Sequence, residues 1–213
     1  MLRYIALFGG TFDPVHNGHL IVARAVAEHC GFERVTFVPT ANPPHKQAAQ
    51  ASGEDRLTML RLATADEELF DICQVELARA GASYTFETLT ELRRQHGPDV
   101  RLDWIIGADM LEDLPKWHRA AEVVEMATII IAARPPQRLE RLFADLEKHF
   151  SSEQLSRLRQ SVAPAPIVDI SSTDIRDRIR GGKSIRFLVP EAVEQYIRQH
   201  RLYAAAQGQA YAK

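Results

Sequence analysis

Cysteine is nearly absent from this chain of 213 residues, which contains only Cys30 and Cys73. The two stand far apart and form no spacing typical of a metal site. Their scarcity argues against a disulfide-stabilised scaffold and is typical of a protein from a reducing compartment. We expect both thiols to be buried and structural.

Long apolar runs are absent as well. The stretch after Arg3 is too short for the apolar core of a signal peptide, and it lacks a small-residue cleavage site. No other apolar run reaches the length that spans a bilayer. We therefore expect a cytoplasmic protein with no membrane partner.

An excess of positive charge is also missing, because 26 lysines and arginines face 28 aspartates and glutamates, for a net charge of −2. This balance removes the general electrostatic reason to bind a polyanion, so we expect no nucleic-acid partner. A local basic cluster can still bind a small anion. The oligomeric state is left open.

Apolar residues, in contrast, make up 46% of the chain, which is enough for one large core. There is no internal repeat and no linker long enough to divide the chain. We expect a single domain over 1–213, in which about 204–213 form a frayed tail.

Short apolar runs alternate with segments of helical spacing. The runs predict strands at 4–8, 35–39, 101–107, 127–133 and 165–170, with a weak edge strand at 70–77. Helices are predicted at 19–31, 55–65, 84–97, 171–182 and 190–200, with two short helices separated near Pro115 and further helical segments up to about 160. This alternation indicates an α/β fold with a doubly wound, mostly parallel sheet flanked by helices.

The segment GGTFDPVHNGH at 9–19 follows the first strand directly. Ligands of an open parallel sheet bind beyond the carboxyl ends of its strands, so this loop lies where a ligand is expected. Gly9 and Gly10 allow positive φ angles and close approach of the backbone, and their amides suit an anion. His16 and His19 can present both rings on one side and stabilise growing negative charge. Asp13 is expected to shape the loop.

This segment has two other interpretations. A glycine turn with two structural histidines is the simpler one, although the pairing at this position favours function. A zinc site is disfavoured, because no third ligand stands nearby in a recognisable spacing, and no metal-binding residue is predicted.

A second segment, ISSTDIR at 170–176, opens a predicted helix that ends at Gly181. Ser172 or Thr173 is expected to be its N-cap, and Arg176 lies one turn inside. Free amides and hydroxyls at a helix start, together with an arginine, suit a polyphosphate. Taken alone, the segment is better explained by simple capping with solvated arginines, and only its pairing with the first motif favours a functional role.

His16-Asn17-Gly18-His19 resembles the HxGH motif of the nucleotidyltransferase superfamily, and ISSTDIR resembles its ISSTxxR motif. The two motifs are highly specific together, and the resemblance covers almost the whole chain. It is closest to the family of bacterial nicotinate-mononucleotide adenylyltransferases. The resemblance implies a Rossmann-like nucleotidyltransferase fold and an enzyme that joins nicotinate mononucleotide to ATP, releasing pyrophosphate, with Mg²⁺ as cofactor.

The resemblance also implies roles for individual residues. The catalytic set is His16, His19 and Arg176. The ATP-binding set contains these three together with Gly9, Gly10, Thr11, Phe12, Gly107, Asp109, Ile170, Ser172 and Thr173. The acceptor-binding set is Lys46, Tyr84, Thr85, Trp117 and Arg134, in which Tyr84 and Thr85 match the segment for the nicotinate carboxylate and Trp117 stacks on the pyridine ring.

Alternatives remain at this stage. The acceptor could be nicotinamide mononucleotide or phosphopantetheine, or the chain could be a nucleotide-sensing module without turnover. A tRNA-charging enzyme is disfavoured, because the chain lacks the length for an anticodon domain. The loop from Ala41 to Gly53 is a candidate for a mobile lid.

Overall fold

The protein is described by a computed structural model at residues 4–42, 48–133 and 139–204. Within these residues, six strands form one sheet in the order β3-β2-β1-β4-β5-β6, and every pairing is parallel. The strands are β1 (Tyr4–Gly10), β2 (Val35–Pro39), β3 (Phe70–Ile72), β4 (Arg101–Gly107), β5 (Thr128–Ala133) and β6 (Val162–Pro164). The predicted doubly wound parallel sheet is confirmed.

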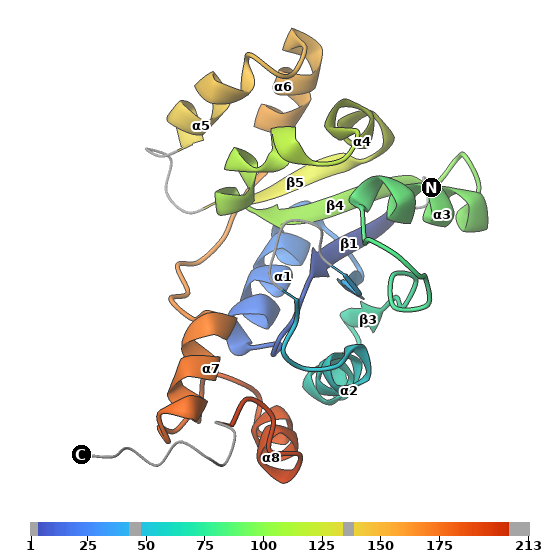
Figure 1. Ribbon diagram of the computed structural model, residues 1–213. Helices are drawn as coiled ribbons and strands as arrows, with labels where there is room; N and C mark the ends of the chain where they lie inside the picture. The colour runs from blue at the N-terminus through green and yellow to red at the C-terminus, as the bar shows by residue number, and fades with distance from the viewer. Residues whose placement is uncertain (1–3, 43–47, 134–138, 205–213) are drawn as a thin grey trace.

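Helices cover both faces of the sheet (Figure 1). The core on one face includes side chains of α3 (Thr85–His96), α4 (Ala120–Met126), α5 (Leu139–Leu146) and α6 (Ser152–Gln160). The core on the other includes side chains of α1 (Asn17–Cys30), α2 (Gly53–Thr64), α7 (Ser172–Arg180) and α8 (Glu191–Gln199). Two short 3₁₀ helices, η1 (Ala108–Glu112) and η2 (Leu114–Lys116), follow β4.

The central strands contribute to both cores, which explains why they are almost continuously apolar in the sequence. On β4, Trp104 and Ile106 pack into the core of the α3–α6 face, whereas Ile105 packs into the opposite one. Leu7 and Phe8 of β1 divide in the same way. Alternation of side chains across a strand buried on both faces produces this pattern.

Three local predictions were wrong. No strand forms at 165–170, because the pairing of β6 ends where β5 ends, at Ala133 beside Pro164. The edge run at 70–77 is a strand only over Phe70–Ile72, and turns follow it. Pro115 does not separate two helices but lies inside η2, in the first turn, where proline needs no amide partner.

The strand order reverses between β1 and β4, whose connections leave in opposite directions. In open α/β sheets, ligands bind beyond the carboxyl ends of strands at this point. Gly10 and Gly107 are the last residues of the two strands. The described part of the chain contains no helix that is long and apolar enough to cross a membrane.

Candidate active site

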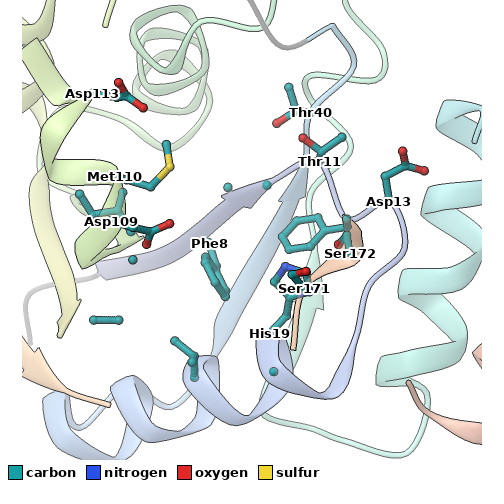
Figure 2. Close-up of a pocket in the computed structure, with 18 of the residues that line it drawn as sticks. Phe8, Thr11, Asp13, His19, Thr40, Asp109, Met110, Asp113, Ser171 and Ser172 are labelled. Atoms are coloured by element: carbon teal, nitrogen blue, oxygen red, sulfur yellow. The ribbon is translucent and has the colours of Figure 1, made fainter. Parts of the chain in front are cut away.

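A cavity of about 990 Å³ opens beyond the carboxyl ends of β1 and β4 (Figure 2). Every predicted site residue that the structure describes lines it. These residues are Gly9, Gly10, Thr11, Phe12, His16, His19, Tyr84, Thr85, Gly107, Asp109, Trp117, Ile170, Ser172, Thr173 and Arg176. Lys46 and Arg134 lie outside the described residues, as does most of the predicted tail.

The two histidines of the first motif stand at the start of α1, which begins at Asn17, earlier than predicted. Their rings stack with centroids 3.6 Å apart and an interplanar angle of 23°. The backbone N–H of His16 donates to Nδ1 of His19 at 3.2 Å. Because Nδ1 is the acceptor, neutral His19 carries its proton on Nε2. The prediction that both rings lie on one side is confirmed.

His16 is the more deeply placed of the two, with an exposed fraction of 6%. Burial lowers its pKa to about 4, so the ring is neutral at pH 7. The His16 side chain and the backbone N–H of His19 form one half of a capping box at the start of α1, although Nδ1 makes no hydrogen bond of normal geometry within the described chain. The buried imidazole therefore lies at the cavity wall as part of the helix cap.

The second motif meets the first in space. The hydroxyl of Ser172 donates to the carbonyl of Pro14 at 2.9 Å, and Nη1 of Arg176 donates to the carbonyl of Asp13 at 2.7 Å. Nη2 of Arg176 also contacts Oγ1 of Thr173 at 3.2 Å. The two segments, far apart in the sequence, therefore build one wall.

The cap of α7 differs from the prediction. The N-cap is Ser171, whose Oγ accepts the N–H of Asp174 at 3.0 Å. Ser172 is already inside the helix, and its hydroxyl is engaged with the first motif instead. Three consecutive hydroxyl residues satisfy the same local pattern, so only the tertiary contact distinguishes them. The predicted end of the helix at Gly181 is confirmed.

The positive φ angles expected at the glycines of the first motif are not observed. Neither Gly9 nor Gly10 has a positive φ, whereas Phe12 does, at 50°. A Cβ at Gly9 would lie 2.3 Å from the ring of Trp104, and one at Gly10 would lie 2.8 Å from the ring of Phe12. Aromatic rings packed on the backbone, not a left-handed turn, exclude larger residues here.

Asp109 lies in the first turn of η1, at the carboxyl end of β4. The N-cap of this short helix is Gly107, so Asp109 does not cap it. A Cβ at Gly107 would come within 2.4 Å of the Asp109 carboxylate. The Gly-x-Asp spacing therefore lets the carboxylate fold back over the end of the strand, at the cavity (Figure 2).

The predicted helix start at Tyr84 and Thr85, which also line the cavity, is confirmed, with Tyr84 as the N-cap of α3. Sequence reasoning missed two neighbours that also line the cavity. The ring of His118 lies 4.6 Å from that of Tyr84. Oγ of Ser83 accepts the N–H groups of Ala41 and Asn42 at 3.1 and 3.2 Å, which joins this segment to the end of β2.

Glu76 is the least expected residue of this wall, with an exposed fraction of 3%. Its Oε1 accepts the hydroxyl of Thr88 at 2.7 Å. Burial raises the pKa of its carboxyl, while the hydroxyl of Thr88, the positive charge of Arg79 and the hydroxyls of Ser83 and Thr40 oppose that rise by stabilising the charge. Oε2 makes no hydrogen bond of normal geometry within the described chain. The sequence around Glu76 indicated only a weak edge strand, and nothing in that pattern predicted that Glu76 lines the cavity.

Comparisons with known proteins find relatives that match this chain over most of its length. Residues 7–178 match the family model described as cytidylyltransferase-like. A protein of Synechococcus sp. (strain JA-3-3Ab) is 44% identical over 94% of this chain and 95% of its own length. A protein of Neisseria meningitidis serogroup B is 39% identical over 95% of this chain and 99% of its own. Both are named "Probable nicotinate-nucleotide adenylyltransferase".

Solved structures show the same fold. Plasmodium falciparum nicotinic acid mononucleotide adenylyltransferase complexed with NaAD superposes with a TM-score of 0.73, at 16% identity, over 94% of this chain and 97% of that one. The same enzyme complexed with APC gives a TM-score of 0.70. With its sheet order, its joined motifs and relatives of this similarity over nearly the full length, the chain belongs to the nicotinate-nucleotide adenylyltransferase family.

Proposed function

We propose that the protein transfers the adenylyl group of ATP to nicotinate mononucleotide in the cytoplasm, forming nicotinate adenine dinucleotide for NAD biosynthesis and releasing pyrophosphate. The observation that carries the proposal is the meeting of the two motifs at one cavity, where Arg176 and Ser172 bind the backbone of the first motif. The names of the relatives, which match over almost the whole chain, support the same reaction.

The reaction needs no nucleophile from the protein. A phosphate oxygen of nicotinate mononucleotide attacks the α-phosphorus of ATP, the bond from that phosphorus to the bridging oxygen breaks, and pyrophosphate leaves with the bonding electrons. The task of the protein is to align two anions and to stabilise charge on the phosphoryl oxygens. Positioning of this kind contributes up to about 7–11 kcal/mol to catalysis.

The polar groups at the joined motifs suit that task. His19 carries a donor on Nε2, because its Nδ1 is occupied by the His16 amide. Neutral His16 stacks on it and holds the ring in place. Arg176 supplies a permanent positive charge at the start of α7. Donors fixed in advance stabilise transition-state charge without a cost of reorganisation.

Mg²⁺ would help to neutralise the triphosphate and the leaving pyrophosphate. The described residues contain no group of three or more histidine, cysteine, aspartate or glutamate side chains that could hold a metal ion. They therefore do not fit a metal site built by the protein alone. Mg²⁺ usually keeps several waters and binds through substrate phosphates, so we propose that it enters with ATP.

The direct test is pyrophosphate release from ATP and Mg²⁺ with one acceptor at a time. We expect turnover with nicotinate mononucleotide and at least tenfold lower kcat/KM with nicotinamide mononucleotide or phosphopantetheine. Arg176→Ala should abolish most of the activity. Arg178→Ala on the same helix should not, because its side chain binds the Ser184 carbonyl and does not line the cavity.

Other outcomes would point elsewhere. Turnover with only another acceptor would show that the substrate is misassigned. ATP binding without pyrophosphate release for any acceptor would indicate a nucleotide-sensing module.

Trp117 offers a separate test of the acceptor end of the cavity. Its side chain is half-buried and lines the cavity near Tyr84 and His118. If it stacks on the pyridine ring, Trp117→Ala should raise the KM for nicotinate mononucleotide about tenfold and leave the KM for ATP unchanged. Trp117→Phe should recover most of the loss. Equal changes in both KM values would place the ring outside the acceptor site.

A further inference from the structure

The carboxylate of Asp13 is the centre of a buried network beneath the first motif. Its exposed fraction is 5%. Oδ2 accepts the N–H of Gln50 at 2.8 Å, and Oδ1 accepts the N–H of Ala51 at 3.1 Å and the hydroxyl of Tyr203 at 2.8 Å. The predicted role of Asp13 in shaping the loop is confirmed, and its three partners come from two parts of the chain that are distant in sequence.

Two arginines lie near this carboxylate. Arg56 is almost fully buried and its Nη1 donates to the carbonyls of Thr11 and Thr40, at 2.8 and 2.7 Å. Burial lowers the pKa of Arg56, and the charge of Asp13 opposes that effect. Arg176, on the cavity side, has Nη1 4.0 Å from Oδ2 of Asp13. The negative charge of Asp13 thus lies near two positive charges, that of the structural Arg56 and that of Arg176 at the cavity.

Arg176 is close to Asp13 without being bound to its carboxylate. At 4.0 Å the pair is beyond hydrogen-bond distance, and Nη1 donates to the Asp13 backbone carbonyl instead. The carboxylate is already satisfied by other donors. A carboxylate with fewer donors would attract the guanidinium, because charge-assisted hydrogen bonds are the stronger ones.

Tyr203 is the one side-chain donor to that carboxylate among the described hydrogen bonds, and it follows α8 near the end of the chain. Its ring is buried, and its φ of 63° is in the left-handed region, which is unfavourable for a bulky residue. Burial raises the pKa of the Tyr203 hydroxyl, and the negative charge of the nearby Asp13 raises it further. The hydroxyl therefore keeps its proton. Tyr203 therefore makes its hydrogen bond to Asp13 from an unfavourable backbone conformation and with a buried hydroxyl.

We propose that Tyr203 is a positioning residue for the phosphate-binding site: its hydroxyl satisfies the Asp13 carboxylate and thereby leaves Arg176 directed at the cavity. The inference rests on the proposed function, in which Arg176 holds ATP phosphates. Without the hydroxyl, Oδ1 keeps only the Ala51 amide among the described hydrogen bonds, and Nη1 of Arg176 lies 4.0 Å from Oδ2. The guanidinium then pairs with Asp13 and is withdrawn from ATP.

The test is Tyr203→Phe, with Tyr196→Phe as a matched control. Tyr196 lies on α8, and its hydroxyl donates to Oδ1 of Asp55 at 2.9 Å, but neither residue lines the cavity. We expect Tyr203→Phe to raise the KM for ATP about tenfold, because the free energy of one hydrogen bond to a charged group corresponds to a change of about this size. The KM for nicotinate mononucleotide should change less than twofold. Tyr196→Phe should change neither KM.

Inorganic triphosphate binding, measured by calorimetry, provides a second readout that needs no turnover. We expect its affinity to fall in Tyr203→Phe and not in Tyr196→Phe. In an Asp13→Asn background, Tyr203→Phe should add less than a twofold effect, because no carboxylate remains to attract Arg176. A merely structural role of Tyr203 would instead change both KM values together, or change stability alone.

The outcomes separate the inference from the proposed function. If the wild type turns over normally and Tyr203→Phe behaves like Tyr196→Phe, the inference is wrong and the function stands. If the wild type releases no pyrophosphate but Tyr203→Phe alone weakens triphosphate binding, the function is wrong and the inference stands. Absence of ATP and triphosphate binding in the wild type would overturn both.

Discussion

The buried inner ring of His16 and the outer ring of His19 stack with their centroids 3.6 Å apart, and each side chain faces the backbone N–H of the other residue in a capping box at the start of α1. Nδ1 of His19 accepts the amide of His16, which fixes the tautomer of the outer ring. Burial holds the inner ring neutral. The pair therefore consists of one supporting ring and one oriented donor, and each role leads to a different measurable effect.

His19→Ala is expected to lower kcat by about 10²–10³, because the variant loses a donor to charge that develops in the transition state. The KM for ATP should change much less. His29→Ala is the matched control, since His29 is an exposed residue on the same helix. Pyrophosphate release under saturating substrates measures both, and an undiminished rate in His19→Ala would remove this ring from the mechanism.

His16 should make the protein less stable in mild acid. Its folded pKa of about 4 is below the ordinary value of 6.5, so the unfolded chain binds more protons between these pH values. The stabilising contribution is complete above pH 6.5 and is lost as pH falls towards 4, with about 2 kcal/mol lost between pH 7.5 and pH 5. Urea unfolding of the wild type and His16→Gln at both pH values measures it.

The variant should lack this part of the pH dependence. His149→Gln, at an exposed site, should behave as the wild type does. Parallel stability profiles for the wild type and His16→Gln would show that His16 is not buried in its neutral form.

Glu76 should have the opposite effect on the pH dependence of stability, making the protein less stable as pH rises. Burial raises its folded pKa, so the folded protein binds more protons than the unfolded chain just above the ordinary value of 4.5. The stability that protonated Glu76 contributes is complete below the ordinary pKa of 4.5 and is lost as pH rises through the folded pKa. Glu76→Gln keeps an acceptor for Thr88 without the charge, so its stability relative to the wild type should increase with pH.

Denaturant titrations from pH 4.5 to pH 8 measure this effect. Glu153→Gln, at an exposed site in the first turn of α6, should show no such trend. A constant difference between Glu76→Gln and the wild type over that range would contradict the assignment of a buried, destabilised charge.

Gly107→Ala should impair ATP binding more than folding. The added Cβ would come 2.4 Å from the end of the Asp109 side chain, which can move away but must then leave its place over β4. We expect the KM for ATP to rise about tenfold, as for the loss of one hydrogen bond to a charged group, with a small change in stability. Gly181→Ala is the control, because its Cβ would make only an ordinary contact with Asp177. An unchanged KM in Gly107→Ala would mean that Asp109 does not contact the nucleotide.

Local errors in the sequence-based prediction have physical reasons. Ser171, not Ser172 or Thr173, caps α7, because the hydroxyl of Ser172 is engaged by Pro14. The run at 165–170 has the composition of a strand, but a strand exists only where a neighbour pairs with it, and the described pairing of β6 with β5 extends no further than Pro164. Propensity describes what a segment can do, and tertiary contacts select among its options.

The sequence by itself determined the alternating fold class and the two motifs, because side-chain periodicity and short loop patterns are properties of neighbours in the chain. Only the tertiary structure decided that Tyr203 meets Asp13, a residue 190 positions away, and that Glu76 lies in the cavity wall. Contacts of this kind depend on how the strands are ordered and how the helices cover them. They leave no periodic trace in the sequence, because a single hydrogen bond between distant residues requires only one suitable side chain at each end.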